Sequence, residues 1–485
     1  MERRWMILLD SYEGLSKKAV NMMSAVVSEY VKYVVPVKTA TAASADEISA
    51  NNLIVIGKAE SNPLLEQCRK KGLIDVPGQE QGYCVYVGES LWNPEGQMIL
   101  VAGTDEPGVL YGCVDFCNRY CGDIICRDGA IWKEDFFELL FGKKLNEWRI
   151  SSSPAIKTRG IWTWGHVIYD YRRFLENMVR LRLNEVVIWN DRVPFNANDI
   201  VEYAHSLGIK VIWGFSWGWG TSCKKILEKF DDRVFQELKE NVLQTYEKEY
   251  ADTGCDGIYF QSFTELSTDY VNGKCIAEVV TELVNDISGE LLERHPDLHI
   301  QFGLHATSVK NHLDIMKKVD DRVHIVWEDC GAFPYSTVAD AIDGFDQTKD
   351  LTGELIKLRG SQEQFGVVLK GLVMLDWSSF ENFSESYVMG ERTEAFLQRR
   401  QISKDRVWKI VQGNWLKNAD YARRIIELIA QEGIDPMVHA LVEDGMLENK
   451  IMLPVAIYAQ MLWEPGADTW ELMGQVAKYP CVSNV

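Results

Sequence analysis

The sequence lacks the short motifs that would assign a chemistry at once. It contains no CxxC pair, no HExxH and no cluster of histidine and cysteine, so we expect neither a metal site nor a cofactor. It has no glycine-rich loop to cradle a phosphate. The glycine-bearing turns of the first 150 residues lack GxGxxG, which argues against a dinucleotide site.

Long apolar runs are also missing. No stretch approaches the roughly 18 residues of a membrane span, and the apolar run near Trp5 is far too short for the core of a secretory signal. The eleven cysteines are an odd number without paired spacing, which favours free thiols and a cytoplasmic location. Cys113, Cys117 and Cys121 fall at helical spacing, and we interpret them as buried thiols on one helix face rather than metal ligands.

Positive charge is scarce as well. The formal net charge is −20, which disfavours nucleic acid and anionic membranes as partners because both bind basic faces. An anionic small substrate, held by a few local Arg or Lys side chains, remains compatible with this balance. Aromatic residues are abundant, with 16 Trp and 19 Tyr. Aromatic faces are the usual platforms for sugar rings, although most such side chains fill cores.

With 485 residues the chain is too long for one core, and its pattern changes along its length. Residues 1–150 are predicted to form a small α/β domain with strands near 53–57, 82–87 and 97–103 and a helix through 111–120. Residues 151–154 are a plausible linker. Residues 394–485 are expected to form a C-terminal helical region, in which 420–432 is a strong helix.

Between residues 151 and 393 strands and helices alternate, which predicts an α/β fold with a parallel sheet closed into a (β/α)8 TIM barrel. Amphipathic stretches such as 171–183 and 231–250 separate the strands. The expected strands are 160–164, 185–190, 210–215, 257–261, 298–303, 323–327 and 366–376. The last of these reads as one long strand or two short ones, so the eighth barrel position stays open.

Polar and aromatic residues follow nearly every predicted strand. Because the carboxyl ends of barrel strands line one mouth, these side chains are expected to converge there. The set comprises Trp162, Trp164, His166, Asn190, Asp191, Trp213, Trp217, Trp219, Gln261, Glu265, His305, Trp327, Glu328, Asp329, Asp376 and Trp377.

Glu265 follows the fourth strand and is our candidate for a general acid that protonates a glycosidic oxygen. Phe260 and Phe263 are close in sequence, and an apolar surround would raise the pKa of its carboxyl group, as a neutral-pH acid requires. Gln261 and Phe263 are expected on the same strand face, toward a polar lumen. A helix-capping or ion-paired glutamate in a loop is the alternative.

Glycoside hydrolysis needs a second carboxylate, either a base that holds water or a nucleophile. Glu328 and Asp329 are neighbours, so at most one should face the lumen unless the strand has already bent. Asp376 is the other candidate. Each of the three could equally be a hydrogen-bond partner, and the sequence leaves the choice open.

Several side chains are candidates for substrate binding. Trp162, Trp164, Trp213 and Trp217 would stack sugar rings, and Trp327 and Trp377 belong to the same group. Arg159, Arg192 and Lys370 could bind the carboxylate of a uronate, or could form ordinary ion pairs. His166 and His305 could orient a hydroxyl or tune a carboxylate, or could be structural.

The region from residue 53 to 120 resembles the α/β domain that precedes the barrel in three groups of exo-acting glycosidases. The segments that carry the resemblance are Val55-Ile56-Gly57, Glu60-Ser61-Asn62-Pro63, Gly82-Tyr83 and residues 102–112, which read AGTDEPGVLYG. The groups are the family 67 α-glucuronidases, the family 20 β-hexosaminidases and the family 84 hexosaminidases. The order of domains is closest to that of the α-glucuronidases, and the chain could form a divergent, separate family.

The resemblance implies a glycosidase that removes terminal sugars from oligosaccharides or small glycosides, with an α-glucuronidase-like activity favoured and a β-N-acetylhexosaminidase as alternative. Glu265 has the place of the α-glucuronidase acid at the end of strand four. Family 20 enzymes carry an Asp-Glu pair there, whereas this chain has Thr264-Glu265, and the paired Asp of family 84 is absent too. Cleavage assisted by a substrate acetamido group is therefore not expected.

Two other classes remain. One is a carbohydrate-binding barrel without activity, since a fold does not imply a function. The other is a lyase or isomerase with a Schiff-base lysine, for which Lys370 is the only tempting residue, although it lies in mid-strand. The expected partner is a carbohydrate substrate, and a homo-oligomer is compatible with the sequence.

Overall fold

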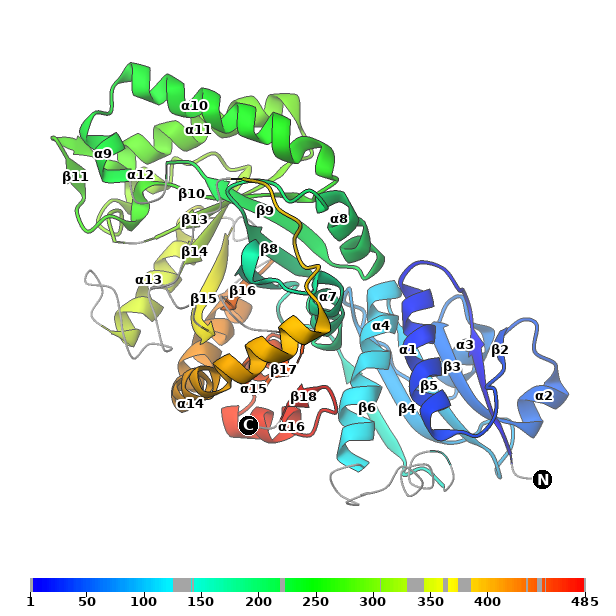
Figure 1. The fold of residues 1–485 in the computed structure, drawn as a ribbon. Coiled ribbons are helices and arrows are strands. Elements are labelled where there is room, and N and C mark those ends of the chain that lie inside the picture. The colour runs from blue at the N-terminus through cyan, green and yellow to red at the C-terminus, as the bar shows by residue number, and fades with distance from the viewer. Residues whose placement is uncertain are drawn as a thin grey trace.

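The computed structural model describes residues 3–124, 141, 144–218, 223–305, 307–328, 344–360, 365–373, 385–432, 435–442, 447–449 and 451–483. Within these ranges the chain forms an N-terminal α/β domain beside an eight-stranded barrel (Figure 1). None of the helices within these ranges is long and apolar enough to cross a membrane.

The N-terminal domain is built on one six-stranded mixed sheet in the order β2-β1-β3-β5-β4-β6. β4 and β6 run antiparallel to their neighbours, and the other strands are parallel. The strands are β1 (Trp5–Leu9), β2 (Val37–Thr39), β3 (Asn52–Lys58), β4 (Tyr83–Glu89), β5 (Gln97–Gly103) and β6 (Trp148–Ser152). Ser151 and Ser152, expected in a linker, lie in β6, so the sheet continues slightly past the predicted boundary.

Helices cover both faces of this sheet. They are α1 (Gly14–Tyr30), α2 (Ala45–Ala50), α3 (Pro63–Lys70) and α4 (Glu106–Asp115), which continues into a π-helical turn, Phe116–Cys121. Asp105 caps α4 by accepting a hydrogen bond from the backbone N–H of Gly108 at 2.8 Å. Gly108 and Gly112 allow close packing, because an added Cβ would lie 2.2 Å from the Gly82 oxygen and 2.7 Å from Val101, respectively.

The cysteines of this helix lie largely as the sequence predicts. Cys113 and Cys121 are buried, whereas Cys117 is only partly buried. Burial raises the pKa of the Cys117 thiol to about 12, so that it stays protonated at neutral pH.

Eight parallel strands close into a barrel in the order β7-β8-β9-β10-β13-β14-β15-β16, with β16 pairing with β7. The strands are β7 (Thr158–Trp164), β8 (Glu185–Trp189), β9 (Lys210–Ser216), β10 (Gly257–Gln261), β13 (His299–Leu304), β14 (Val323–Glu328), β15 (Phe365–Val373) and β16 (Met437–Val442). The predicted (β/α)8 barrel is therefore present.

The eighth strand corrects the predicted C-terminal boundary. The segment from Phe365 to Val373 is a single strand with a register shift between Leu369 and Val373, and the barrel closes only through β16. The boundary at residue 393 is therefore wrong, because the long helix α14 (Glu394–Glu432) connects the seventh and eighth strands. β16 has only six residues and follows the 39 residues of α14, so the sequence pattern did not indicate a separate strand there.

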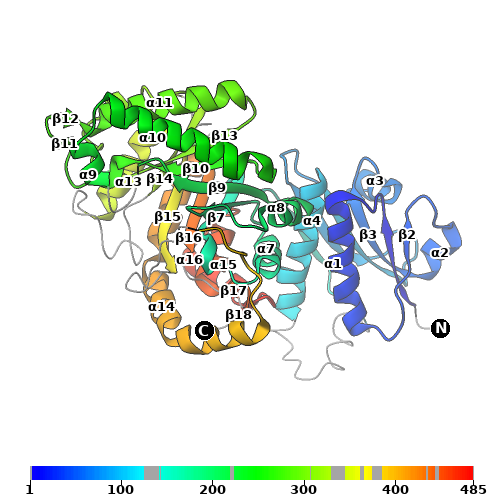
Figure 2. The same cartoon turned by 45° about the horizontal axis from the view of Figure 1, so that its top comes forward.

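Helices surround the barrel, and α7 and α8 lie between its strands and the N-terminal domain (Figure 2). The chain ends in a short helical and strand region. The helices and short strands not yet named are α7 (Tyr171–Arg180), α8 (Ala197–Ser206), α9 (Cys223–Glu228), α10 (Asp232–Thr245), β11 (Tyr270–Val271), β12 (Lys274–Cys275), α11 (Ile276–Arg294), α12 (Leu313–Met316), α13 (Phe345–Lys357), β17 (Ile451–Met452), α15 (Leu453–Met461), α16 (Thr469–Val476) and β18 (Val482–Ser483).

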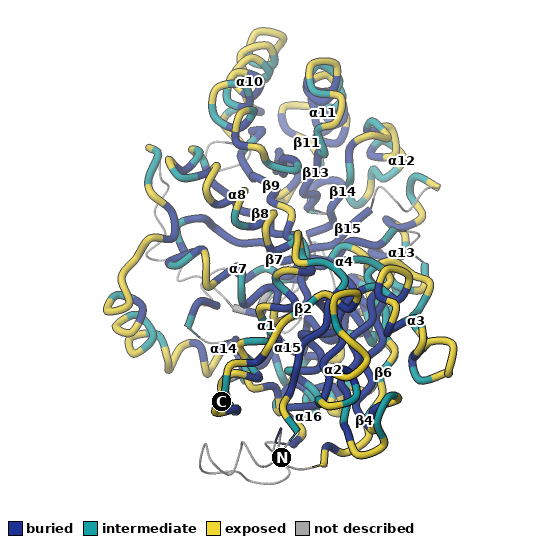
Figure 3. Tube along the Cα trace, turned by 90° about the vertical axis from the view of Figure 1, so that its right-hand side faces the viewer, coloured by how far each residue is buried: buried dark blue, intermediate teal, exposed yellow. Residues whose placement is uncertain are grey.

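The barrel strands are buried, and the exposed residues gather on outer helices such as α10 and α11 (Figure 3). The lower part of the lumen is polar. Glu185 on β8 accepts a hydrogen bond from Gln301 on β13 and lies 2.9 Å from the Nε2 atom of His439 on β16. Gly160 on β7 makes room for His439, whose ring would lie 2.3 Å from an added Cβ.

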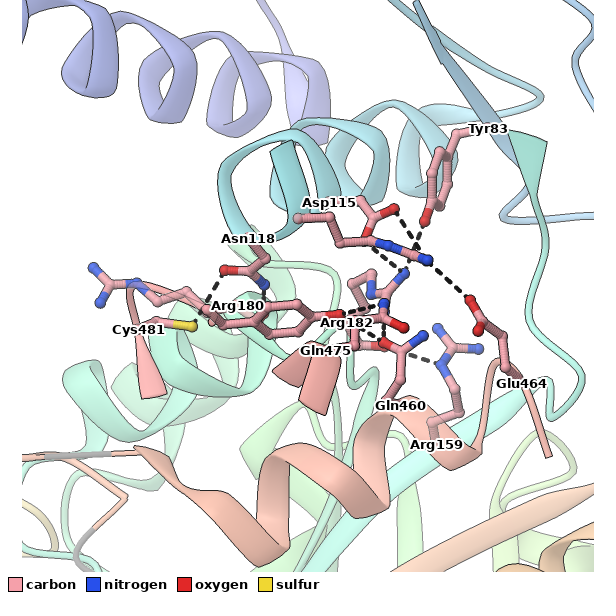
Figure 4. Close-up of polar contacts among 12 residues, drawn as sticks. Tyr83, Asp115, Asn118, Arg159, Arg180, Arg182, Gln460, Glu464, Gln475 and Cys481 are labelled. Carbon is pink, nitrogen blue, oxygen red and sulfur yellow. Dashed lines mark hydrogen bonds and ion pairs between the residues drawn. The ribbon is translucent and has the colours of Figure 1, made fainter. Parts of the chain in front are cut away.

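A buried ion-pair network joins the N-terminal domain, the barrel and the C-terminal region (Figure 4). Arg182, in the loop after α7, lies 3.3 Å from Asp115 and donates to the Tyr83 hydroxyl at 2.8 Å and to Gln460 at 2.5 Å. Arg119 connects Asp115 to Glu464. These contacts fix the orientation of the barrel relative to the first domain.

Candidate active site

A polar cluster lies in the upper lumen, at the carboxyl ends of β10, β13, β14 and β15. Its centre is Glu328, whose side chain is almost fully buried. One carboxylate oxygen, Oε1, accepts hydrogen bonds from the Tyr259 hydroxyl at 2.5 Å and from the Gln261 amide. The other, Oε2, lies 3.1 Å from both His305 Nε2 and Lys370 Nζ. Four neighbouring strands thus each contribute to one constellation.

Glu328 is held as an anion. Burial alone would raise the pKa of its carboxyl group, but the electrostatic interactions with His305 and Lys370 and the hydrogen bonds from His305 and Tyr259 outweigh burial and keep the pKa well below its usual range. Because side chains alternate along β14, Trp327 and Glu328 point in opposite directions. Glu328 points into the lumen, whereas Trp327 is fully buried on the outside and donates to Thr352 of α13 at 3.1 Å.

Tyr259 is a member of the cluster that the sequence analysis missed. It lies two residues before Gln261 on β10 and therefore shares its face, a signal that was available from strand periodicity. Gly303 on β13 leaves the necessary space, since an added Cβ would lie 2.1 Å from the Tyr259 hydroxyl oxygen and 2.7 Å from Glu328 Oε1. Burial raises the pKa of Tyr259 well above its usual value, so that its hydroxyl remains a donor.

Glu265 lies at the mouth above this cluster. It ends a short 3-10 turn, Phe263–Glu265, so strand parity does not reach it as the sequence analysis assumed. Its Oε1 atom is 4.0 Å from His305 Nε2, and its side chain is 53% exposed. Phe260, expected beside it, points outward and stacks between Trp217 and Phe302.

The loops that carry Glu265 and His305 are tied together. The buried Thr264 hydroxyl accepts from the backbone N–H of His305 at 3.1 Å. The Thr264 carbonyl in turn accepts from the hydroxyls of Thr307 and Ser308 at 3.0 and 2.7 Å. These bonds hold Glu265 and His305 in one relative position.

Aromatic and amide side chains lie at the carboxyl ends of β7 and β8, on the opposite side of the lumen. Trp162 and Trp164 point inward and pack edge to face, with ring centroids 5.3 Å apart. Asn190 is buried and accepts from the Tyr387 hydroxyl at 2.6 Å. Burial raises the pKa of Asp191, although a hydrogen bond from Trp189 and the charge of Arg192 oppose it.

His166 follows this strand in a short 3-10 turn, with its ring 6.2 Å from that of Trp164. Burial, with a smaller contribution from the Arg400 charge, lowers its pKa to about 4, so that the imidazole is neutral at pH 7.

Two of the tryptophans expected to stack sugars lie elsewhere. Trp213 and Trp217 are fully buried outside the lumen, where Trp213 packs near Tyr250 and Trp217 stacks on Phe260 at 3.7 Å. The reason is alternation: β9 pairs with β10 so that Gly214 and Ser216 are level with the inward-facing Tyr259 and Gln261. Trp213 therefore faces the helices.

Two expected cations are engaged in other contacts. Arg159 is fully buried at the entry of β7, where it donates to the carbonyls of Arg182 and Ile156 and to Gln81 of the first domain. Arg192, in the loop after β8, forms an ion pair with Glu249. Lys370 is the one of the three proposed uronate partners that lies in the lumen cluster.

Four residues proposed for the site, Trp219, Asp329, Asp376 and Trp377, lie outside the described residues. Within the described part of the chain, no group of three or more His, Cys, Asp or Glu side chains is arranged to hold a metal ion. The chemistry available to the described cluster is therefore that of an exposed carboxyl group, a buried carboxylate, an imidazole and an ammonium group.

No protein-family model matches this sequence, and no curated protein matches it. Among solved structures the chain is similar to CpGH84D, at 14% identity over 85% of this chain and 65% of that one with a TM-score of 0.46. It is also similar to BtGH115A, a family GH115 4-O-methyl-alpha-glucuronidase with specificity for decorated arabinogalactans, at 15% identity over 96% and 57% with a TM-score of 0.46.

A glycoside hydrolase family 20 beta-N-acetylglucosaminidase is similar at 12% identity over 86% of this chain and 93% of that one, with a TM-score of 0.45. The chain spans less than two thirds of the length of the first two structures. At identities of 12 to 15% and TM-scores below 0.5, none of the three says what this chain binds or does.

Proposed function

We propose that this protein is a glycoside hydrolase in which Glu265 is the general acid. The observation that carries the proposal is the pairing of two carboxyl groups in different environments at one barrel mouth. Glu265 is solvent-accessible beside His305, whereas Glu328 is buried and kept ionised. Separation of a proton donor from a fixed anion is the arrangement that glycosidic cleavage needs.

Glu328 contributes a negative charge close to the reacting centre. Glu265 Oε1 and Glu328 Oε2 are 4.0 and 3.1 Å from the same His305 nitrogen, so they lie at most about 7.1 Å apart. An anion at that range stabilises the positive charge that builds on the sugar ring in an oxocarbenium-like transition state. This upper limit on the distance between the two carboxyl groups is compatible with the roughly 5 Å separation in retaining enzymes and with the roughly 6.5 Å minimum separation in inverting enzymes.

The favoured substrate is a terminal uronic acid on an oligosaccharide or small glycoside. Lys370 is the cation of the lumen cluster and would bind the substrate carboxylate, while Trp164, Asn190 and Asp191 would contact the ring and its hydroxyls. For the rival N-acetylhexosaminide, the residue before the acid would have to orient an acetamido group. The Thr264 hydroxyl is buried and already accepts from the His305 backbone, which argues against that role.

Lys370 does not favour the rival Schiff-base chemistry. A carboxylate 3.1 Å from Nζ stabilises the charged ammonium form, which is not nucleophilic. If the protein nevertheless forms an imine with a carbonyl substrate, borohydride reduction will trap an adduct on Lys370.

The experiment is Glu265→Gln assayed on a panel of aryl glycosides that includes a uronide and an N-acetylhexosaminide. We expect loss of roughly 10²–10⁴-fold in kcat/KM on the substrate that the wild type cleaves, because a positioned acid contributes about that factor. Glu282→Gln, at an exposed position of α11, is the matched control and should keep full activity. Hydrolysis of a methylumbelliferyl glycoside retained by the Glu265 variant would refute the assignment.

A further inference from the structure

The Glu328 carboxylate has no free acceptor position. A carboxylate offers about four lone-pair sites, two on each oxygen. In this structure Tyr259 and Gln261 donate to Oε1, and His305 and Lys370 lie at hydrogen-bond distance from Oε2. A nucleophile must direct a lone pair at the anomeric carbon, and a base must accept a hydrogen bond from water. Two hydrogen bonds and two nitrogen atoms at 3.1 Å, all from the chain itself, leave neither option open.

The donor role of His305 follows from its surroundings. Its Nδ1 atom is buried without a hydrogen-bond partner among the described residues, so a hydrogen on Nδ1 would be left unpaired. His305 Nε2 is the nitrogen near the two carboxyl groups, 3.1 Å from Glu328 Oε2 and 4.0 Å from Glu265 Oε1. Lys370 Nζ lies 3.1 Å from the same Glu328 oxygen and 3.3 Å from His305 Nε2.

The space around Glu328 is also closed. Its side chain is 4% exposed, and the nearest backbone on β13 is Gly303, where even a methyl group would come within 2.7 Å of Oε1. The low pKa of its carboxyl group further weakens it as a proton acceptor.

We infer that Glu328 is a positioning residue and not the second catalytic carboxylate. It holds the His305 N–H and the Lys370 ammonium at the floor of the mouth, and His305 faces Glu265 from there. When Glu265 gives up its proton, the new carboxylate lies near this N–H, which stabilises the charge. The inference rests on the proposed function and assigns Glu328 to the support of Glu265.

The first test is the pH profile of Glu328→Gln on the substrate found in the panel above. Removing an anion within 7.1 Å makes loss of the Glu265 proton easier, so the alkaline limb should move down by about 0.5–1.5 pH units. His305 lies 4.0 Å from Glu265, and the titratable groups Glu328, Lys370 and Tyr259 lie beyond it in the same cluster. Tyr259→Phe removes one donor but keeps the charge of Glu328, and should leave the limb in place. An unmoved limb in Glu328→Gln would overturn the inference.

The second test does not depend on a folded variant. Wild-type enzyme is incubated with a 2-deoxy-2-fluoro aryl glycoside of the cleaved sugar, and its peptides are analysed by mass spectrometry. A label on another carboxylate, or no label with an inverted product, supports the inference. A label on Glu328 would overturn it. A wild type inert on every glycoside would instead contradict the proposed function itself.

Discussion

At the scale of single residues, the packing of Tyr259 and Glu328 depends on the absence of a side chain at Gly303. We expect Gly303→Ala to destabilise the protein by about 1–3 kcal/mol, because the added methyl group would overlap the buried Tyr259 hydroxyl and the Glu328 carboxylate. Urea denaturation measures this change, and glycosidase activity should fall with it. Gly289→Ala is the control, since nothing lies within 4 Å of its added Cβ on α11 and the change should stabilise by up to about 1 kcal/mol. Equal stability of both variants would contradict the packing described.

The predicted direction of a strand side chain was right where we used the alternation of side chains along a strand, and wrong where we did not use it. Gln261 was expected in the lumen, and it contacts Glu328 there. The same argument, carried two residues back, would have found Tyr259. Trp213 and Trp327 were assigned to the mouth for their chemistry, although their positions next to inward-facing Gly214 and Glu328 direct them outward. Beyond the strand end, in the turn of Glu265, periodicity gives no orientation.

At the scale of elements, a buried carboxylate links three barrel strands. Glu185 on β8 contacts Gln301 on β13 and His439 on β16. Burial opposes its ionisation, but the hydrogen bond and charge of His439 dominate together with the other partners and lower the pKa of Glu185 to about 2. A folded-state pKa below the unfolded value of about 4.3 means that the stabilisation is complete above pH 5 and is lost as pH falls toward 2.

We therefore expect Glu185→Gln to lower the free energy of unfolding by on the order of 2–3 kcal/mol at pH 7. The difference from wild type should shrink as the pH falls from 4.5 toward 2, which urea denaturation at several pH values would follow. The exposed Glu282→Gln on α11 serves again as control and should show neither effect. A difference that stays constant below pH 4.5 would contradict the ion pair.

β16 is the barrel strand that was not predicted from the sequence. Its six residues follow the 39-residue helix α14, so the C-terminal part was predicted to be helical throughout. Seven barrel strands were recognisable because each repeats an apolar run that ends in a polar or aromatic residue. β16 lies outside this series and closes the barrel by pairing with β7, which is far away in the sequence. A local sequence pattern does not indicate such a long-range pairing.

At the scale of the whole molecule, the N-terminal domain and the barrel share one buried charge network. Arg182 and Asp115 are 3% and 0% exposed and lie 3.3 Å apart. Arg182→Met should cost about 3–5 kcal/mol, because the buried Asp115 would keep only the more distant Arg119, at 3.8 Å, as a partner. Thermal unfolding should shift to lower temperature, and the two parts should no longer unfold together.

Arg233→Met is the matched control, since Arg233 is 72% exposed in its pair with Glu237 on α10. Pairs of this kind contribute about 0–1 kcal/mol, so its unfolding should be near that of wild type. Equal unfolding of the two variants would show that the network in Figure 4 does not join the domains energetically.

The account as a whole rests on Glu265 as proton donor, and the most direct measurement is the leaving-group dependence of Glu265→Ala. A general acid matters most when the departing oxygen is basic. We predict a loss of roughly 10²–10⁴-fold for an alkyl or methylumbelliferyl glycoside and little loss for the dinitrophenyl glycoside of the same sugar. An equal loss for all leaving groups, or no loss for any, would contradict the role of Glu265 as proton donor.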